Sequence, residues 1–103
     1  MSDNLPNYFR LSIEADKDLD DIFDYTEHEH SFNQAIKYLS DLDTLFEKLI
    51  KNPHIGKERK EIKKGIFSIA EQEHVVFYQI KKEYILIIRV LHGRRDIPKH
   101  LNL

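Results

Sequence analysis

The sequence predicts an α+β fold: an N-terminal strand, a helical hairpin, then three antiparallel strands, in the order β-α-α-β-β-β. Two observations carry this prediction. Apolar side chains recur at helical spacing between residues 15 and 52, whereas residues 66–91 are rich in β-branched and aromatic side chains. The helices are therefore expected to stack on one face of a mainly antiparallel sheet.

The first two elements are a short strand and an acidic helix. Residues 8–13 alternate partly between apolar and polar side chains, which indicates a strand. Residues 15–27 repeat their apolar side chains with helical spacing, at Leu19, Ile22, Phe23 and Thr26. The first turns of this helix are rich in aspartate, which suits the positive end of the helix dipole, and Asp16 is the expected N-cap.

A longer second helix begins after residue 30. Ser31 and Gln34 stand three residues apart, as in a capping box, and Asn52-Pro53 ends the helix because the residue before proline avoids helical angles. Between these ends lies a wide apolar stripe, formed by Phe32, Ala35, Ile36, Leu39, Leu42, Leu45, Phe46, Leu49 and Ile50. The short connection between the two helices predicts a hairpin.

Three strands are expected in the C-terminal half, at residues 66–71, 74–80 and 84–91, with Lys81-Lys82-Glu83 as a tight turn. The last strand has almost no polar alternation, so both of its faces should be covered, as in the centre of a sheet. Arg89 interrupts this run, and a guanidinium among apolar side chains needs an acceptor. A structural ion pair, for which Asp96 is a candidate, and a functional role for Arg89 both stay open.

Length and composition bound the class of protein. The 103 residues, 41% of them hydrophobic, suit one domain spanning 1–103. No apolar run reaches the roughly 20 residues that span a bilayer, and the first residues lack the basic and apolar regions of a signal peptide. The absence of cysteine excludes a disulfide framework and a thiolate metal site. We expect a cytoplasmic protein without membrane contact.

The charge is unevenly distributed along the chain. Residues 1–52 carry five Lys and Arg and twelve Asp and Glu, a net charge of −7, whereas residues 53–103 carry eleven and six, a net charge of +5. Such polarity can steer a charged partner toward one face of the molecule. A domain that only binds nucleic acid is usually basic overall, and this chain has a net charge of −2.

The strongest candidate site is the end of the last strand together with the residues just beyond it. A buried strand delivers polar groups to the surface here, namely Arg89, His92, Arg94, Arg95 and Asp96. The glycine at position 93 permits a bulge or a positive φ that re-aims the chain, so that Arg94 and Arg95 leave the sheet.

Other clusters are weaker candidates. His28-Glu29-His30 has residue types that bind metals, but the two histidines would diverge on a helix, so a solvated loop is the better interpretation. His54 and His74 stand alone, and isolated histidines are more often surface or core residues than ligands. The sequence has no phosphate-cradling glycine loop, nucleophile elbow or zinc signature. We therefore expect no metal and no cofactor.

From residue 15 to residue 96 the chain resembles the ParE/RelE superfamily of toxins from bacterial type II toxin–antitoxin systems. The segments that carry the resemblance are Asp18-Leu19 through Ile22 and Tyr25, then Ala35 and Tyr38, then residues 52–57, 76–80 and, most diagnostic, 88–96. The resemblance implies the β-α-α-β-β-β fold predicted above and a role as a toxin that an antitoxin neutralises.

The C-terminal segment looks more like the ParE branch, whose members are described as inhibitors of DNA gyrase, than like the RelE branch, whose members cut messenger RNA on the ribosome. A ParE-like toxin acts by binding: it traps gyrase so that broken DNA is left and replication stalls. Sites of the RelE type resemble one another in a late catalytic tyrosine or histidine. Here no tyrosine follows Tyr84, and His100 is the only later candidate.

A ribosome-dependent endoribonuclease is the alternative, and the chain contains parts of such a site. A ribonuclease needs cations around the phosphate and an acid and base that let the 2′-hydroxyl attack. His92 could act as acid or base, with Arg59, Arg89, Arg94 and Arg95 around the phosphate. A third reading is an inactive relative that only binds its antitoxin.

The resemblance also implies partners. A ParD-like antitoxin would fold on binding and cover an apolar groove beside the helical hairpin, giving a toxin–antitoxin hetero-oligomer that serves plasmid stabilisation. Its expected contacts are Tyr25, Phe32, Tyr38, Arg59 and Arg89. DNA gyrase, the expected target, would meet a surface formed by Arg94, Arg95, Asp96 and His92, since arginine makes planar multidentate contacts. Direct binding of nucleic acid is not expected.

Overall fold

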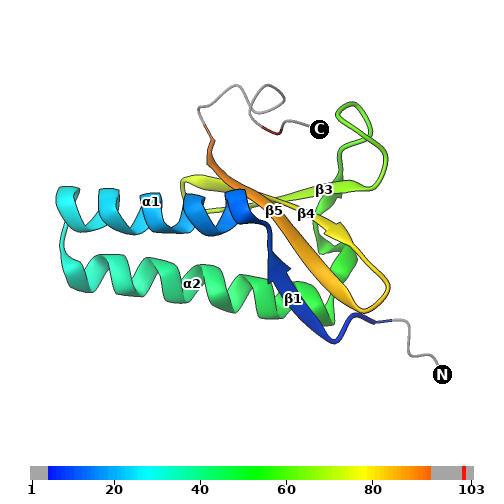
Figure 1. Cartoon of the computed structure of the whole chain (residues 1–103), viewed down its shortest axis with the longest axis horizontal. Helices are drawn as coiled ribbons and strands as arrows, with labels where there is room; N and C mark the ends of the chain where they lie inside the picture. The colour runs from blue at the N-terminus through cyan, green and yellow to red at the C-terminus, as the bar shows by residue number, and fades with distance from the viewer. Residues whose placement is uncertain (1–4, 94–100, 102–103) are drawn as a thin grey trace.

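The structure, a computed structural model, describes residues 5–93 and residue 101. Two helices, α1 (Ile13–Glu29) and α2 (Phe32–Lys51), form a hairpin that packs against one face of a five-stranded sheet (Figure 1). The predicted order of strand, two helices and three strands is confirmed. In Figure 1 the hairpin extends beyond the sheet at the end where the two helices are connected.

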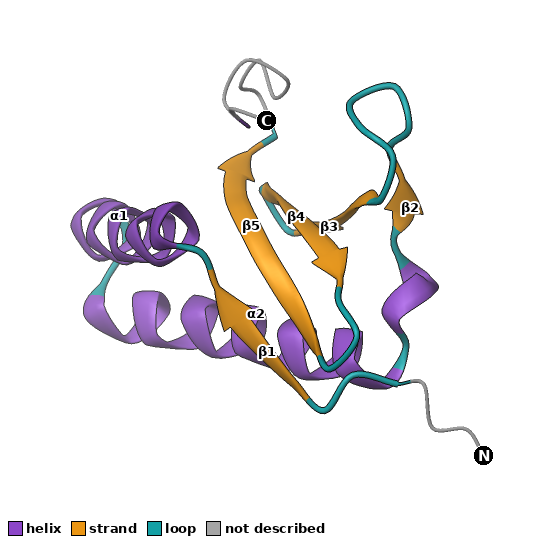
Figure 2. Cartoon of the chain, turned by 45° about the vertical axis from the view of Figure 1, so that its right-hand side comes forward, coloured by secondary structure: helices purple, strands orange, loops and turns teal. Residues whose placement is uncertain are grey.

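The sheet has the strand order β1-β5-β4-β3-β2 (Figure 2). Its strands are β1 (Tyr8–Leu11), β2 (Lys57–Glu58), β3 (Ile66–Glu71), β4 (His74–Ile80) and β5 (Tyr84–His92). The three C-terminal strands form an antiparallel meander, as predicted, while β1 adds to β5 in parallel. The short strand β2 lies in the charged connector and pairs with β3, which the sequence pattern did not indicate.

Strand β5 is covered on both faces, which confirms the prediction from its unbroken apolar run. On one face Ile85, Ile87 and Val90 belong to the main core with the helices. On the other face Leu91 packs with Phe77 and other residues of a second, smaller cluster. The central strand therefore has little freedom to move, and its last residues are held on a rigid element.

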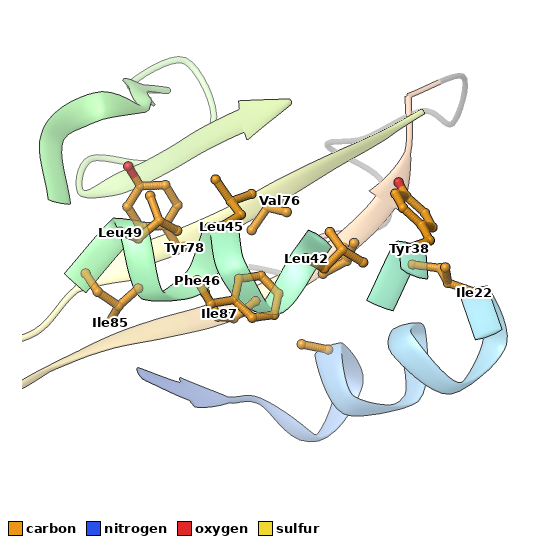
Figure 3. Close-up of a cluster of buried hydrophobic side chains, with 12 residues drawn as sticks. Ile22, Tyr38, Leu42, Leu45, Phe46, Leu49, Val76, Tyr78, Ile85 and Ile87 are labelled. Carbon is orange, nitrogen blue, oxygen red and sulfur yellow. The ribbon is translucent and has the colours of Figure 1, made fainter. Parts of the chain in front are cut away.

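The main core fills the space between the hairpin and the sheet (Figure 3). Helix α2 contributes Tyr38, Leu42, Leu45, Phe46 and Leu49, and the sheet contributes Val76, Tyr78, Ile85 and Ile87. Most of these side chains are fully buried, and burying each large apolar side chain stabilises the fold by about 1.5–3 kcal/mol.

Helix α1 begins earlier than the sequence pattern predicts. Its N-cap is Ser12, whose Oγ accepts a hydrogen bond from the amide of Ala15 at 2.9 Å, so the assignment of Asp16 as N-cap was wrong. Serine and aspartate are both good caps, and the sheet decides between them. The Ser12 amide and hydroxyl bond to the carbonyls of Ile87 and Ile88 in β5, which places the start of the helix at the sheet.

Helix α2 has the predicted ends but a narrower buried face. The amide of Gln34 donates to Ser31 Oγ at 3.0 Å, and the helix stops before Pro53. Phe32 and Ile36, which belong to the predicted apolar stripe, are 55% and 49% exposed. Both lie in the first turns of α2, next to the connection with α1, and nothing among the described residues covers them fully.

A register shift in β5 bends the strand shortly before its end. Tyr78 pairs with Ile87 and Phe77 with Arg89, so Ile88 is an extra residue opposite β4. The bulge expected near Gly93 thus lies at Ile88, and Gly93 does not adopt a positive φ. Instead, the Gly93 amide donates to the carbonyl of Glu73 at 2.9 Å. The bulge breaks the alternation of side chains in front of the candidate site.

Within residues 5–93 and 101, no helix is long and apolar enough to cross a membrane.

Candidate functional site

The end of β5 lies beside helix α1, where an open groove is lined by residues of both elements. Of the five residues that the sequence placed in the candidate site, Arg89 and His92 both line this groove. Arg94, Arg95 and Asp96 follow directly in the chain and lie outside the described residues. The described part of the site is therefore the end of β5 and the groove beside it.

Arg89 forms a two-pronged ion pair with Asp18 of α1. Its Nε and Nη2 donate to the two carboxylate oxygens at 2.8 and 2.9 Å. The hydrogen bonds to Asp18 raise the pKa of Arg89 above its already high value. Both side chains are largely buried, at 18% and 11% exposed. The expected acceptor for Arg89 thus comes from α1, more than 70 positions away in the chain.

Asp18 also accepts a hydrogen bond from the backbone amide of Val90, at 2.9 Å. Strand β1 pairs with β5 only as far as Ile87, so beyond that point the edge of β5 has no neighbouring strand on this side. The carboxylate supplies an acceptor that a strand would otherwise provide. The Asp18 carboxylate therefore accepts hydrogen bonds both from the largely buried guanidinium of Arg89 and from the backbone amide of Val90 at the edge of β5.

The sequence contains a signal for this pair that the pattern analysis did not use. Asp18 lies three residues after Ala15 and four before Ile22, both buried, so it sits on the apolar face of α1. A carboxylate on a helix's buried face and a guanidinium in a buried strand both need a partner. Each is the natural partner of the other.

His92 ends β5 and stands next to His74, the first residue of β4. The two rings meet edge to face with centroids 5.5 Å apart. His92 Nε2 also lies 3.6 Å from the carboxylate of Glu73. His74 in turn contacts Tyr38 of α2, whose hydroxyl oxygen is 2.6 Å from His74 Nδ1. A chain of titratable groups thus runs from the buried core to the groove.

The hydroxyl of Tyr38 has one proton and two neighbours. It donates to the backbone carbonyl of Glu71 at 3.0 Å, in which case it accepts from a protonated His74 Nδ1. Burial, with the nearby carboxylates of Glu71 and Glu73, raises the pKa of Tyr38 from 10.0 to about 12. The tyrosine therefore stays neutral and positions His74, which the sequence had presented as an isolated histidine.

Arg59 lies on the other side of the sheet. Its guanidinium pairs with Glu61 at 2.6 Å, donates to Ser68 Oγ at 3.1 Å and stacks 5.9 Å over the ring of Phe77. Hydrogen bonding to Arg59 lowers the pKa of the Glu61 carboxyl. Phe77 belongs to the cluster on the face away from the helices, and Arg59 does not line the groove of Arg89 and His92.

The residues expected to meet an antitoxin are only partly on the surface. Tyr25 is 62% and Phe32 55% exposed, and Phe32 contacts Phe23 edge to face with centroids 5.8 Å apart. Tyr38 is only 7% exposed, so what it offers a partner is a small part of its surface in the cavity beside α2. Arg89 is engaged by Asp18.

Two adjoining hollows run along α1 and share Tyr25 and His74. The first, of about 820 Å³, lies between α1 and the ends of β4 and β5. The second, of about 560 Å³, lies between the hairpin connection and the β3–β4 turn. We call the two together the α1 groove. Among the described residues, no three carboxylates or histidines are grouped so as to hold a metal ion.

The fold is shared with toxins of the ParE/RelE superfamily. The solved structure of the chromosomal ParDE toxin–antitoxin system from P. aeruginosa superimposes with a TM-score of 0.74 at 18% identity, covering 87% of this chain and 98% of that one. A chain of the RelBE2 toxin–antitoxin complex from Mycobacterium tuberculosis gives 0.60 at 22% identity, covering 85% and 99%. These likenesses show the fold, and they confirm the predicted architecture.

Sequence comparison identifies the family. Residues 9–97 match the ParE toxin of the type II toxin–antitoxin system parDE. Toxin ParE1 of Caulobacter vibrioides is 36% identical over 93 residues, which cover 90% of this chain and 96% of that toxin. Toxin ParE1 of Mycobacterium tuberculosis is 32% identical over 94 residues, with the same coverage. The chain belongs to the ParE toxin family of type II toxin–antitoxin systems, as its resemblance to the superfamily implied.

Proposed function

We propose that this ParE-family toxin inhibits DNA gyrase in the cytoplasm by binding and is neutralised by a ParD-like antitoxin. Family membership supports a toxin of the parDE type, and relatives named Toxin ParE1 match almost their whole length. The solved relative from P. aeruginosa is described as a ParDE system, which supports an antitoxin of the ParD kind for this chain.

The observation that favours binding over catalysis is the dispersal of the groups that a ribonuclease would need. Arg59 packs over Phe77 and pairs with Glu61 on the face away from the helices. Arg89 is neutralised by Asp18 at the groove, where His92 also lies. A phosphate-binding site needs cations that converge and are not already neutralised. These two arginines do not meet that need.

We assign the target surface to the segment that leaves the end of β5. His92 is the last residue of that strand, and Arg94, Arg95 and Asp96 follow it in the sequence. Arginine side chains make planar, multidentate contacts and are frequent in the energetically dominant parts of protein interfaces. Strand β5, which precedes this segment in the sequence, is an interior strand that is covered on both faces.

The proposed target is tested with purified toxin that has been freed of antitoxin. We expect inhibition of supercoiling by gyrase and no cleavage of messenger RNA in a translation extract. Cleavage without gyrase inhibition would instead establish the RelE-type alternative, for which the neighbouring groups Tyr38, His74 and His92 provide acid and base functions. If neither activity is found, the chain is an inactive relative that only binds its antitoxin.

The target surface is tested by removing two charges. Arg94→Ala combined with Arg95→Ala is expected to abolish growth inhibition on expression, while antitoxin binding stays largely intact. Lys81→Ala combined with Lys82→Ala is the matched control, because these two exposed cations lie at the opposite end of β5. Toxicity that survives the Arg94 and Arg95 changes would remove these arginines from the target surface.

A further inference from the structure

We infer that the segment joining β2 to β3, residues 57–65, contacts the phosphate backbone of duplex DNA through exposed lysines. We call this segment the basic loop. The inference goes beyond the proposed binding to gyrase, because it gives the toxin a second contact, with the DNA on which gyrase acts. Only that source of the DNA rests on the proposed function. The sequence-based expectation of no nucleic-acid contact followed from the charge of the whole chain, whereas the structure shows how the charge of this one segment is arranged.

The basic loop is positively charged in a chain that is negatively charged overall. It carries five Lys and Arg and two Glu, a net charge of +3, against −2 for the whole chain. In the sequence the two glutamates stand among the lysines, a pattern typical of a solvated segment of mixed charge. In the structure both glutamates have partners within the basic loop itself.

Glu58 and Glu61 are both engaged inside the basic loop. Glu58 accepts a hydrogen bond from the backbone amide of Gly65 at 3.0 Å, which joins the two ends of the loop. Glu61 forms its ion pair with Arg59 at 2.6 Å, and the charge of Lys57 also helps to lower the pKa of the Glu61 carboxyl. These two carboxylates therefore leave the remaining lysines of the loop without an ion-pair partner among the described residues.

The remaining lysines are Lys60, Lys63 and Lys64, and all three are exposed. The amides of Ile62 and Lys63 both donate to the carbonyl of Arg59, at 2.9 and 3.1 Å, so the chain makes one helical turn here. Side chains that are three and four positions apart are neighbours on such a turn. Three ammonium groups are therefore presented by one short, internally hydrogen-bonded segment.

The basic loop is fixed to the sheet by its other side chains. Arg59 donates to Ser68 Oγ at 3.1 Å and lies over the ring of Phe77, and its backbone amide donates to the carbonyl of Ile66 at 2.7 Å. Ile62 packs against the cluster that contains Ile66 and Phe77. A loop that is already ordered loses little conformational entropy when its lysines meet a partner.

The exposed surface of the basic loop offers charge without an apolar anchor. The one large apolar side chain of residues 57–65, Ile62, packs against the sheet and is not among the exposed ones. Protein interfaces are depleted in lysine and depend on buried aromatic and apolar anchors. A DNA backbone binds through its phosphates, for which compact ammonium groups suffice. The chemistry of the loop therefore favours DNA over an acidic protein.

The place of the basic loop in the molecule also suits DNA. Strand β2 forms one edge of the sheet, whereas α1, with its eight acidic side chains, adjoins β5 near the other edge. Figure 2 shows the loop above β2 and α1 on opposite sides of the molecule. A protein with separated charges of opposite sign turns its basic side toward phosphates and its acidic side away from them.

The probe is a fluorescein-labelled DNA duplex of arbitrary sequence and about twenty base pairs, titrated with purified toxin in the absence of gyrase. Fluorescence anisotropy gives the affinity at several NaCl concentrations. Three phosphate contacts predict that the logarithm of the association constant falls with the logarithm of salt concentration with a slope of about −3. Lys60→Gln with Lys63→Gln and Lys64→Gln should bring this slope close to zero and weaken binding at least about tenfold near 0.05 M salt.

Two further variants separate the position of the charges from their number. Arginine at the same three positions keeps the charge and should keep the slope within about 0.5 of the wild-type value. The matched control, Lys48→Gln with Lys81→Gln and Lys82→Gln, removes three exposed lysines that lie outside the basic loop, and affinity should change less than about threefold. All of these side chains are exposed, so the variants should fold, which circular dichroism checks.

A second measurement places the contact on the DNA that gyrase holds. With gyrase and plasmid DNA, the glutamine variant of the basic loop should need about tenfold more toxin for the same inhibition of supercoiling. Its affinity for gyrase in the absence of DNA should stay unchanged.

The outcomes separate the inference from the proposed target. If the loop and control variants bind the duplex alike, the inference is overturned and inhibition of gyrase stands. Tighter binding to a single-stranded RNA of equal length would assign the basic loop to RNA, and a loss of affinity for gyrase alone with DNA binding unchanged would assign it to protein; either result overturns the inference. If the toxin does not inhibit gyrase but its affinity for the duplex depends on the three lysines, the proposed target fails and the DNA contact stands.

Discussion

Asp18 and Arg89 are charged residues in apolar surroundings, and each provides the ion-pair partner that the other needs. The aspartate lies on the buried face of α1 and the arginine lies in a buried strand, yet their side chains meet at 2.8 Å. Because Asp18 also accepts from the Val90 amide, its loss would remove three hydrogen bonds at once, two from Arg89 and one from Val90. The pair therefore holds the end of β5 against the helix.

We expect Asp18→Ala to lower the free energy of unfolding by about 2–4 kcal/mol, because it removes the two-pronged ion pair from a largely buried guanidinium and the acceptor of the Val90 amide. Arg89→Ala should cost less, since the remaining carboxylate keeps the Val90 amide as a donor. Urea denaturation measures both. Asp20→Ala, an exposed change on the same helix, serves as control and should stay within about 0.5 kcal/mol. Equal losses at positions 18 and 20 would contradict the role of the pair.

Tyr38 makes stability depend on pH in the alkaline range. Its pKa rises from 10.0 to about 12 on folding, so the folded state keeps a proton that the unfolded state has lost. Stability from this group is complete below pH 10 and is lost as the pH rises through the folded pKa, by up to about 2.5 kcal/mol.

The comparison with Tyr38→Phe isolates this effect. Near pH 8 we expect the variant to be about 1 kcal/mol less stable, because it lacks the hydrogen bonds to Glu71 and His74. The difference should shrink between about pH 10 and 12 and then reverse, since only the wild-type chain carries the ionising group. Unfolding free energies from urea titrations across this range test it, and a constant difference would show that Tyr38 does not ionise differently in the two states.

At the scale of elements, Ser12 connects the start of α1 to the bulge of β5. Its hydroxyl accepts from the Ala15 amide as N-cap and donates to the carbonyl of Ile88 at 2.7 Å. Ile88, the extra residue of β5, is thus hydrogen-bonded to the N-cap of α1. The Ser12 side chain therefore fixes the start of α1 relative to the end of β5. Ser31 caps α2 in the same way but in an exposed position.

Ser12→Ala is expected to cost about 1–2 kcal/mol, and Ser31→Ala about 1 kcal/mol or less, because only Ser12 also satisfies a strand carbonyl. Ser12→Thr should recover part of the loss, since threonine keeps a capping hydroxyl. The midpoints of urea unfolding give the order. Equal losses from the two serine-to-alanine changes would mean that the contact with Ile88 contributes nothing.

At the scale of the whole molecule, the charge asymmetry seen in the sequence belongs to one helix. Helix α1 carries eight acidic side chains and one lysine, a net charge of −7, whereas α2 carries three of each sign. The first acidic residues of α1 favour the helix dipole, but carboxylates further along repel one another. The acidic surface of the toxin therefore lies along α1, which also forms part of the rim of the α1 groove.

Screening this repulsion should stabilise the fold. We expect the urea midpoint to rise as NaCl is raised from about 0.02 to 0.3 M, because exposed charges along α1 interact within a Debye length. Asp20→Asn with Asp24→Asn should add about 0.5 kcal/mol at low salt and reduce the effect of salt. Asp43→Asn with Glu47→Gln on neutral α2 should add less, because it also removes the attraction between Glu47 and Lys51, four residues further along the helix. A midpoint that does not respond to salt would show that the repulsion on α1 is offset within the native state.

Sequence periodicity alone was enough to determine both helices, the strands β1, β3, β4 and β5, their order, and the covering of β5 on both faces, but it did not indicate β2. Local features such as the apolar spacing in α2, its cap at Ser31 and the turn at residues 81–83 depend on neighbours in the chain, and the structure has all of them. The segments between residues 15 and 96 that resemble the superfamily also indicated the family, which the match over residues 9–97 confirms.

Only the tertiary structure decided which polar residues meet. The pairing of Asp18 with Arg89, the contact of Tyr38 with His74, the choice of Ser12 as N-cap and the bulge at Ile88 all join positions far apart in the chain. No local pattern encodes such contacts, because they depend on how the hairpin is placed on the sheet. The same placement separates Arg59 from Arg89 and opens the α1 groove, and these two results determine which functions the site can support.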